Sequence, residues 1–595
     1  MSTNYSLPVE LSPDVRYNQA MTNLELAEIF ERIANLSEIK GEVIYKTLAY
    51  RRAAESLMAL SEPAAELDTQ GRLLEIPAVG KAIAEKIHEL LATGRLEFLV
   101  RLEEEVPPSL VELLRVPDVG PKKVALFWKQ AGVTDLAGLE AAAQAGRLRQ
   151  LPSLGEKSEA RILEGLAALK RRSTRRLLGT ARPAALRWLT WLRAQPGVLR
   201  AEAAGSLRRW KATIGDLDLV AASTSPAEVM AAFASHPEVH RVLGQGENKS
   251  SVELVDGLNL QLWIQPPERF GTLLQFVSGS KDHNVRLREL AQKRGLSLSE
   301  RAITTAAGEE WLYADEEGVY QTLGLPWIPP ELREDRGEIQ AALENHLPAL
   351  LESSNICADL HTHSTWSDGV DSIQAMAEAA LARGLRVLAI TDHSVGLGVA
   401  NGLSIERLRA QRAEIQAVQA RLGDRIRLLQ GSEIEIHADG SLDYPDEILA
   451  ELDIVVASLH TSLRQPREQI TARLVQAIRH PHVDLIGHPS GRLMPDREGA
   501  DLDWEAVFAA ARESGTGLEI DAHPARLDLD EVHARRAADL GIPLAIDTDA
   551  HAADQFDVLE YGVSVARRAW LGNQHILNAW PAERLLSWLK RDALH

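Results

Sequence analysis

The chain has 595 residues and a net charge of −20, with 45% hydrophobic and 25% charged residues. This composition is typical of a folded globular protein, the length predicts several domains, and the acidic balance argues weakly against a protein that coats DNA nonspecifically. The single cysteine excludes an intrachain disulfide, and no apolar run is long enough to span a membrane, so we expect a cytoplasmic protein.

The amino-terminal part of the chain is predicted to be helical. Apolar residues recur at helical spacing in LELAEIFERIANL and VIYKTLAYRRAAESL, and short Pro/Gly turns interrupt the helical pattern further on. We expect one helical domain over residues 1–101 and a second over residues 102–176.

A short pattern recurs three times within these helices: IPAVGKAIAEKI at 76, VPDVGPKKVALF at 116 and LPSLGEKSEARI at 151. Each repeat places a glycine before a helix, where a tight turn leads to free N–H groups that can bind a phosphate without reading bases. The repeats resemble the helix-hairpin-helix motifs of DNA repair proteins. We therefore expect DNA contacts from Gly80, Lys81, Gly120, Lys122, Lys123, Gly155 and Lys157.

A basic stripe follows the repeats. Between Arg161 and Lys211 there are 13 Lys or Arg and only two acids, and the stripe includes Lys170, Arg171, Arg172, Arg175 and Arg176. Such a stripe can bind a phosphate backbone in an acidic protein, although a solvated helix face would look the same.

From Val198 the pattern changes to short strands, as in DLDLVAA and SSVELVDGLNLQLWI, which predict a small sheet within residues 177–265. Asp216 and Asp218 stand at positions i and i+2 of one strand, so both carboxylates point to one face. Two such carboxylates can hold a pair of Mg²⁺ ions, whereas a solvated strand edge would not explain the preceding Gly-Ser turn at Gly205.

This segment resembles the palm of family X DNA polymerases. IYKTLAYRRAAESL and IPAVGKAIAEKIHELLATG resemble that family's amino-terminal domain, and FVSGSKDHNVRLRELAQKRGLSLSE resembles its thumb, expected over residues 266–335. The resemblance implies Mg²⁺ or Mn²⁺ in the palm and Lys86 as a lyase nucleophile. It also implies that nucleotide is bound by Gly205, Ser206, Arg209, Gly215, Phe276, Gly279 and Asn284.

The chain departs from the family in the next strand. The family carries its third catalytic aspartate there, but this chain reads GLNLQLWI, with Gln261 at that position. An amide is a poorer metal ligand than a carboxylate and no base at neutral pH, and Asp256 has the wrong parity to replace it. We expect weakened polymerisation with DNA and nucleotide binding retained. Full activity through a water or another carboxylate, or a silent DNA-end-binding front half, are the alternatives.

After a linker over residues 336–355, apolar strands alternate with helices through residues 356–595, which predicts a distorted α/β barrel. The fold class is thus multidomain, α+β followed by α/β. Metal-binding side chains stand at the predicted strand ends, and such a set can hold two or three ions that hydrolyse phosphate esters. They are His361, His363, Asp368, His393, Glu433, His460, His488, Asp549 and His551, with Asp392 expected to orient a neighbouring ligand.

The stretches ADLHTHSTWSDG, AITDHS, HPHVDLIGHPSGRL and AIDTDAH resemble the polymerase-and-histidinol-phosphatase (PHP) domain fused to bacterial family X polymerases. The resemblance implies Mn²⁺, Zn²⁺ or Fe in this site and 3′→5′ exonuclease action, with abasic-site cleavage or 3′-phosphate removal as further possibilities. We expect a monomer associated with the nucleoid that acts on gapped, nicked or 3′-ended DNA with dNTPs. The helix-hairpin-helix repeats disfavour a small-molecule phosphatase, which needs no DNA clamp.

Overall fold

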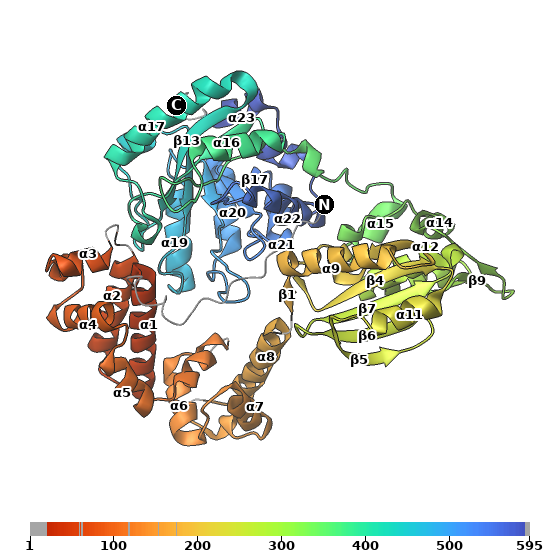
Figure 1. Cartoon of the computed structure of the whole chain (residues 1–595), viewed down its shortest axis with the longest axis horizontal. Helices are drawn as coiled ribbons and strands as arrows, with labels where there is room; N and C mark the ends of the chain where they lie inside the picture. The colour runs from red at the N-terminus through yellow and green to blue at the C-terminus, as the bar shows by residue number, and fades with distance from the viewer. Residues whose placement is uncertain are drawn as a thin grey trace, which may run out of the picture. The chain divides into compact units, whose positions relative to one another are not determined.

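A computed structural model describes residues 21–589 except 59, 61–62, 117–118, 153 and 174, and describes no side chain at 24, 168 or 170–173. The chain folds into α+β and α/β parts, as predicted (Figure 1). Its described residues up to Leu169 form one compact unit with Val395–Gly402, and the rest form a second. Within the described part of the chain, no helix is long and apolar enough to cross a membrane.

The first unit is helical, as predicted. Helix α1 begins at a capping box between Thr22 and Glu25 and ends at Gly41, whose φ of 94° suits glycine. The apolar faces of the helices form one core that contains Phe30, Leu57 and Phe127. The helices are α1 (Asn23–Lys40), α2 (Ile44–Met58), α3 (Ala64–Thr69), α4 (Lys81–Thr93), α5 (Glu97–Glu105), α6 (Pro121–Ala131), α7 (Leu136–Gln144) and α8 (Glu156–Ser173).

The predicted small sheet has five strands in the order β2-β4-β7-β6-β5. Strands β4 and β7 are parallel and the other pairs are antiparallel. Leu217 and Leu219 of β4 point into the core beside Trp188 of α9, so Asp216 and Asp218 point to the other face. The elements are α9 (Leu178–Arg193), β2 (Val198–Ala203), α10 (Gly205–Arg208), β4 (Asp216–Ser223), α11 (Pro226–Ala234), β5 (Val239–Gln245), β6 (Lys249–Leu254) and β7 (Asn259–Gln265), with a short β1 (Arg176–Leu177) paired to β3 (Thr213–Ile214).

Helices and a three-stranded sheet follow, as the sequence predicts. A buried ion cluster joins this region to the palm sheet, because the Glu316 carboxylate accepts from Arg208 and from Arg333, both at 2.7 Å. The elements are α12 (Phe270–Ser278), α13 (Lys281–Lys293), β8 (Leu296–Leu298), β9 (Ile303–Thr305), β10 (Glu310–Trp311), α14 (Glu316–Thr322) and α15 (Glu338–Leu343).

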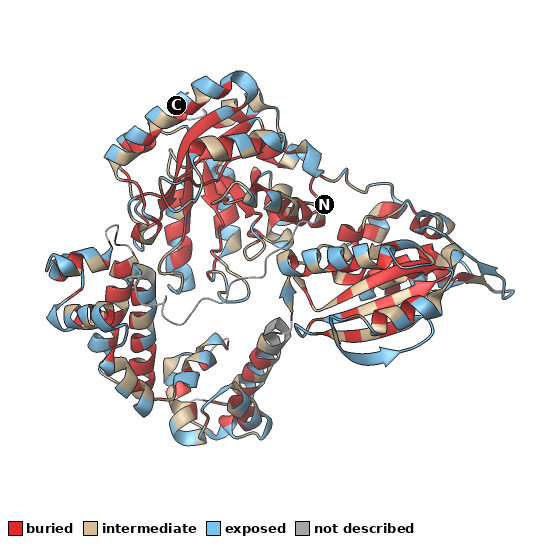
Figure 2. Ribbon diagram, viewed as in Figure 1, coloured by how far each residue is buried: buried red, intermediate tan, exposed pale blue. Residues whose placement is uncertain are grey.

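The carboxy-terminal region is a nearly closed barrel of seven parallel strands in chain order. Its strands are buried almost throughout (Figure 2). A bridge between Thr362 and Ala550 brings the first and last strands together. The strands are β11 (Ala358–Asp359), β12 (Val387–Ile390), β13 (Arg427–Glu435), β14 (Ile454–Ser458), β15 (Leu485–Gly487), β16 (Gly517–Asp521) and β17 (Leu544–Asp547).

Helices connect these strands and cover the barrel (Figure 1). They are α16 (Ile373–Ala382), α17 (Ile405–Leu422), α18 (Asp446–Leu449), α19 (Arg467–Ile478), α20 (Trp504–Ser514), α21 (Glu531–Asp539), α22 (Leu559–Arg568) and α23 (Ala582–Leu589). Because all seven strands are parallel, their carboxyl ends meet at one rim.

Candidate active sites

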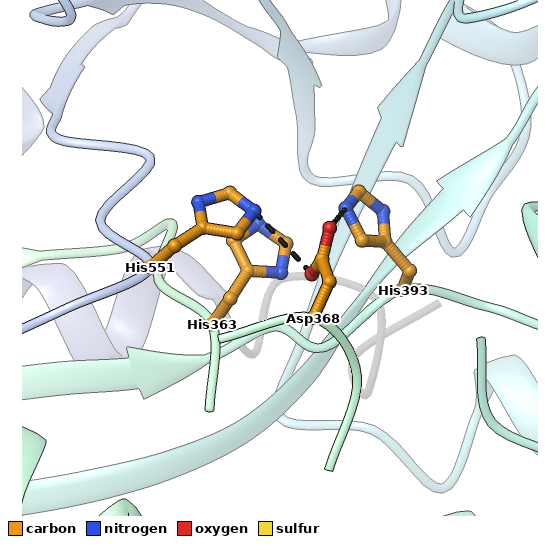
Figure 3. Close-up of side chains that lie close together, drawn as sticks. All are labelled: His363, Asp368, His393 and His551. Carbon is orange, nitrogen blue, oxygen red and sulfur yellow. Dashed lines mark ion pairs between the residues drawn. The ribbon is translucent and has the colours of Figure 1, made fainter. Parts of the chain in front are cut away.

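The barrel rim gathers the nine side chains singled out in the sequence. Eight of them form three overlapping groups, in each of which the donor atoms lie within 4.8 Å of one another. These groups are His363, Asp368, His393 and His551; His361, His363, Glu433 and Asp549; and His393, Glu433 and His460. Figure 3 shows the first of these groups, with Asp368 lying between His551 and His393.

Glu433 is the centre of the cluster. Its Oε1 lies 2.9 Å from His488 Nε2 and 3.2 Å from His460 Nε2, and its Oε2 lies 3.3 Å from His361 Nε2. Since His488 reaches Glu433, the ninth side chain also belongs to the cluster. The site therefore draws on the ends of six strands, and Glu433 itself lies within β13.

Buried carboxylates behind the cluster orient its imidazoles. Glu519 binds His361 Nδ1 at 2.7 Å, and Glu435 binds His460 Nδ1 at 2.7 Å, so each ring turns its Nε2 toward Glu433. Asp392 accepts from Ser364, Ser367 and Gln411 and thereby fixes the loop that carries His363 and Asp368. The sequence indicated the role of Asp392 but gave no sign of the other two carboxylates.

Two of the clustered residues have a left-handed backbone. His488 has a φ of 28° and Asp549 a φ of 51°, values that side chains other than glycine rarely adopt. Such residues cost about 1–3 kcal/mol each and persist where the surroundings fix them. Here the backbone N–H of His488 donates to Glu519, so the carboxylate that orients His361 also holds this strained residue.

The imidazoles divide into two electrostatic classes. Burial, and then the charges of His551 and His393, lower the pKa of His363 to about 3. Burial also opposes the charged form of His460, but Glu433 outweighs it and raises the pKa of His460 to about 10. Burial similarly opposes the charge on Glu433, and His460 and His393 outweigh it and hold the Glu433 pKa well below its usual range. The cluster thus contains imidazoles whose pKa is lowered by burial, such as His363, and imidazoles whose pKa is raised by a neighbouring carboxylate, such as His460.

The donor set fits divalent cations. Nε2 of His361 and Oε2 of Glu433 are buried and face each other, yet neither has a hydrogen-bond partner among the described residues. Unsatisfied buried polar atoms are costly, and a metal ion would satisfy both. Imidazole nitrogens with carboxylate oxygens suit Zn²⁺, Fe²⁺ or Mn²⁺.

Arg526 is a rim residue that the sequence patterns did not reveal. It follows β16 in DAHPARLDL, and its Nε lies 3.2 Å from Asp521 and 3.6 Å from Asp549. Its Nη1 is buried and has no hydrogen-bond partner among the described residues. An arginine directly after a barrel strand, at the end where the loops of the site converge, was the available signal.

The palm brings Asp216, Asp218 and Gln261 together. In the parallel pairing of β4 with β7, Asp218 stands opposite Gln261, and the Gln261 amide donates to the Asp216 carboxylate. Burial, and then the neighbouring Asp216, raise the pKa of Asp218 to about 7. Asp256 instead accepts from Leu258 in the β6–β7 turn, and Glu253 pairs with Arg241.

The turn before these carboxylates is tightly packed. Gly205 has a φ of 59°, and a Cβ there would lie 2.0 Å from Asp218, so only glycine fits. Ser206 lies half-buried on α10, and Gly215 packs against Arg175. Arg209 donates to Glu334 at 3.0 Å and to the Ser278 carbonyl, next to Gly279.

The remaining nucleotide-pocket candidates lie together on α12 and α13. The Asn284 amide donates to the Phe276 carbonyl at 2.7 Å and accepts from Gln275 at 2.8 Å. Phe276 packs edge-on to Trp263 of β7, with 6.4 Å between ring centroids, and so reaches the strand that carries Gln261. Phe276 therefore links the predicted pocket residues of α12 and α13 to β7.

In the first unit, Lys86 lies half-buried on α4. Its amine donates to the Ala82 carbonyl at 3.2 Å and lies 4.8 Å from the centre of the Phe98 ring, which Lys46 also approaches. Burial, and then the charge of Lys46, lower the pKa of the Lys86 amine. A depressed pKa favours the neutral amine that attacks a carbonyl carbon.

The three repeats share one turn geometry. The N–H groups of Val79, Val119 and Leu154 donate to the carbonyls of Ile76, Val116 and Leu151 at 3.1–3.2 Å. Gly80 and Gly120 have φ near −85° and −89°, which any residue can adopt, so they are not needed for a left-handed turn. A Cβ at Gly80, Gly120 or Gly155 would meet nothing, so these helix starts are open to a close ligand.

The lysines of these repeats lie at the same helix starts, where a phosphate could be bound. Lys81, Lys122 and Lys157 are exposed in the first turn of their helices, and Lys123 is half-buried. The basic stripe is described only in part, because the side chains of Lys170, Arg171 and Arg172 lie outside the described residues. Its Arg175 and Arg176 donate to the backbone carbonyls of Thr213 and Asp256.

Four family models match the chain. They are a helix-hairpin-helix domain over residues 21–96, a SAM-like helix-hairpin-helix tandem over 110–168, a DNA polymerase beta thumb over 273–334 and a PHP domain over 359–523.

Curated relatives cover the same regions. The chain is 38% identical over 577 residues to the DNA polymerase/3′-5′ exonuclease PolX of Bacillus subtilis, which covers 96% of this chain and 100% of that protein. It is 31% identical over 232 residues to a probable phosphatase of Thermoanaerobacter, covering 37% of this chain and 89% of the relative. It is 25% identical over 341 residues to DNA polymerase lambda of Rattus norvegicus, covering 52% of this chain and 56% of the relative.

Proposed function

The chain belongs to the PolX family of family X DNA polymerases that carry a PHP domain, and we propose that its barrel is a metal-dependent 3′→5′ exonuclease while its palm is a weakened polymerase. The Bacillus relative is named for both activities and matches the whole of its own length. One observation supports this division of activities. The barrel has all nine clustered side chains, whereas the palm has the amide of Gln261 at the position of the third catalytic aspartate.

In the barrel, the nine clustered residues are those that would hold divalent metals. When bound, these metals supply Lewis-acid activation of the phosphodiester and of the attacking water. The chain's own contribution is to fix the donors. Glu519 and Glu435 turn the imidazoles toward Glu433, and neutral His363 offers a lone pair without first losing a proton. We infer Mn²⁺ or Zn²⁺, with Fe as a further candidate, since imidazole and carboxylate donors suit all three.

Arg526 binds a phosphate oxygen of the substrate beside the cluster. Its Nε lies 3.6 Å from Asp549, and its Nη1 has no hydrogen-bond partner among the described residues, so this guanidinium is suited to the developing charge on a phosphate. Arg526→Ala lowers the exonuclease kcat/KM by about 100-fold, the usual loss for one such donor. Arg526→Lys keeps the charge but loses the fork and recovers part of the rate.

The control for Arg526 is Arg497→Ala. Arg497 is also a partly buried arginine of the rim, but it donates to the Gly491 carbonyl. Metal content by elemental analysis accompanies each rate, because Arg526 also contacts Asp549. Equal rates for Arg526→Ala and the unaltered chain, or a loss matched by Arg497→Ala, would contradict phosphate binding by Arg526.

In the palm, Gln261 replaces the carboxylate that would complete the metal site. Its amide occupies an oxygen of Asp216 that a metal would otherwise use, and it cannot accept the proton of the primer hydroxyl. The candidate pocket residues Phe276 and Asn284 are held together by the hydrogen bond from the Asn284 amide to the Phe276 carbonyl. We therefore infer that dNTPs and DNA are bound while their joining is slow, with Mg²⁺ or Mn²⁺ in the palm.

DNA is recognised through its backbone. The open starts of α4, α6 and α8, with their exposed lysines, support phosphate contacts at Gly80, Gly120 and Gly155. We infer that the substrates are gapped, nicked or 3′-ended DNA, and that the protein works as a monomer associated with the nucleoid.

One assay tests the proposed function. A labelled primer, free or annealed across a one-nucleotide gap, is incubated with the full chain and Mn²⁺ or Mg²⁺, with and without dNTPs. The expected result is shortening from the 3′ end with Mn²⁺ and only slow extension with dNTPs. Extension that outpaces degradation at every metal and dNTP level would refute the division of activities.

Lys86 is the candidate lyase nucleophile, because a neutral amine can form a Schiff base with an abasic sugar. Borohydride traps the unaltered chain on abasic DNA, and Lys86→Ala abolishes the trapped adduct. In Lys46→Ala, removal of the neighbouring charge raises the Lys86 pKa, so the pH profile of trapping moves to more alkaline pH. Undiminished trapping by Lys86→Ala would exclude this residue.

A further inference from the structure

A helix of the barrel holds the nucleotide turn of the palm within the second compact unit. The side chain of Arg568, at the end of α22, is only 2% exposed. Its Nη1 donates to the backbone carbonyl of Arg209 at 2.6 Å and to the Glu334 carboxylate at 3.1 Å. Its Nη2 donates to Glu531 at 2.7 Å, so the guanidinium is anchored on the barrel side as well.

The same turn is fixed at the next residue. Trp210 has a left-handed φ of 53°, which is strained for a bulky side chain and persists only where neighbours fix it. The Arg182 guanidinium lies 4.3 Å from the centre of the Trp210 ring, and Tyr561 of α22 packs against that ring edge-on. Arg182 in turn pairs with Glu560 of α22 at 2.9 Å.

Glu334 joins this clamp to the nucleotide pocket. One of its oxygens, Oε1, accepts from both Arg209 and Arg568. The Arg209 side chain continues to the Ser278 carbonyl beside Gly279. Both the backbone and the side chain of Arg209 are therefore placed by contacts that include Arg568.

We propose that Arg568 is a positioning residue for the polymerase nucleotide site, supplied by the hydrolase barrel. It holds the Gly205–Lys211 turn so that Ser206 and Arg209 face the triphosphate, and the inference rests on the proposed role of those two residues in nucleotide binding. Removing the Arg568 guanidinium takes one donor from the Arg209 carbonyl and one each from Glu334 and Glu531, so the turn relaxes. The barrel is thus part of the polymerase site as well as a hydrolase.

Nucleotide binding by the full chain tests the proposal. The chain is loaded with one-nucleotide-gapped DNA that ends in a dideoxy primer, and the Kd of a non-hydrolysable dNTP with Mg²⁺ is measured by calorimetry. Arg568→Ala raises this Kd about 10-fold, the loss expected for one charged hydrogen-bond network. Arg568→Lys keeps one donor and raises it only about threefold.

The matched control is Arg567→Ala, one residue earlier on α22. Arg567 is also ion-paired, but with Glu331 and Glu352, and its Nη1 donates to the Leu351 carbonyl. The Kd of this variant for the dNTP stays within about twofold of the unaltered chain, because the hydrogen bonds and ion pairs of Arg567 within the described part of the chain lie away from the nucleotide turn. Thermal unfolding of each variant shows whether it is folded at the assay temperature.

The possible results distinguish the positioning role of Arg568 from the proposed function of the chain. An unchanged Kd in Arg568→Ala, or an equal rise in Arg567→Ala, overturns the positioning role while leaving the proposed function intact. If Arg568→Ala does not fold, an unchanged Kd in Arg568→Lys overturns it. If the unaltered chain binds no dNTP, the proposed nucleotide site is refuted and the positioning role falls with it.

Discussion

Replacing His361 and His363 together by alanine abolishes hydrolysis of 3′-ended DNA while the chain stays folded. His363 belongs to two of the three overlapping donor groups, and His361 lies 3.3 Å from Glu433 at their centre. Loss of both imidazoles removes at least one nitrogen donor from two of the three groups. We expect the exonuclease rate to fall by at least about 1000-fold, as befits loss of a metal-assisted site.

The matched control is His480→Ala/His482→Ala. These imidazoles belong to the same barrel, but His480 pairs with Asp446 at 3.3 Å, away from the cluster. The measurements are product formation with Mn²⁺, bound metal per chain and DNA affinity. DNA affinity stays unchanged in both double variants, because the helix-hairpin-helix turns are untouched. Full hydrolysis by the cluster variant would place the nuclease elsewhere.

Gln261→Asp restores template-directed synthesis. The new carboxylate stands opposite Asp218 in the β4–β7 register and releases Asp216 from its hydrogen bond with the Gln261 amide. It supplies both a metal ligand and a proton acceptor, for which a gain of at least about 100-fold in single-nucleotide insertion is expected. The control is Gln261→Asn, which has the length of aspartate without its charge and stays slow.

The same variant carries a pH signature. The folded pKa of Asp218 is about 7, whereas the ordinary carboxyl value is 3.8. Ionisation of this buried carboxyl therefore lowers the stability of the fold progressively as pH rises from 3.8 to about 7. A third carboxylate adds repulsion, so Gln261→Asp has a lower Tm than the unaltered chain at pH 8 in EDTA. The deficit shrinks at pH 5 and with Mg²⁺. An equal Tm in EDTA at both pH values, with no gain in synthesis, would remove Gln261 as the cause of slow polymerisation.

More of the barrel site than of the palm site could be predicted from the sequence. Ligands such as His361, His363 and Asp549 stand in short packets at strand ends, and parallel strands bring their ends to one rim whatever the helices between them do. Strand parity likewise placed Asp216 and Asp218 on one face and indicated that Asp256 could not replace the missing aspartate. These features depend on local periodicity, which a single sequence displays directly.

Contacts between distant segments could not be read in this way. Glu519 lies inside an apolar strand, where its reach to His361 Nδ1 depends on the closure of the barrel. Arg526 and Arg568 look like ordinary surface arginines until folding buries them beside Asp549 and the Arg209 carbonyl. The predicted domain ranges also stay predictions. Contacts between segments group the palm and the barrel into one compact unit, so they do not test the boundary between the two.

The chain order of the barrel strands determines when, during synthesis, the clustered side chains can come together. The contact between His363 and Asp549 spans 186 residues, and the contact between His361 and Glu519 spans 158. During synthesis, the residues of the helix-hairpin-helix repeats and of the palm are made first, and a chain that stops before β17 lacks Asp549 and His551 of the cluster. The full set of clustered side chains can therefore assemble only after β17 and the residues that follow it have been made and have met the first strand.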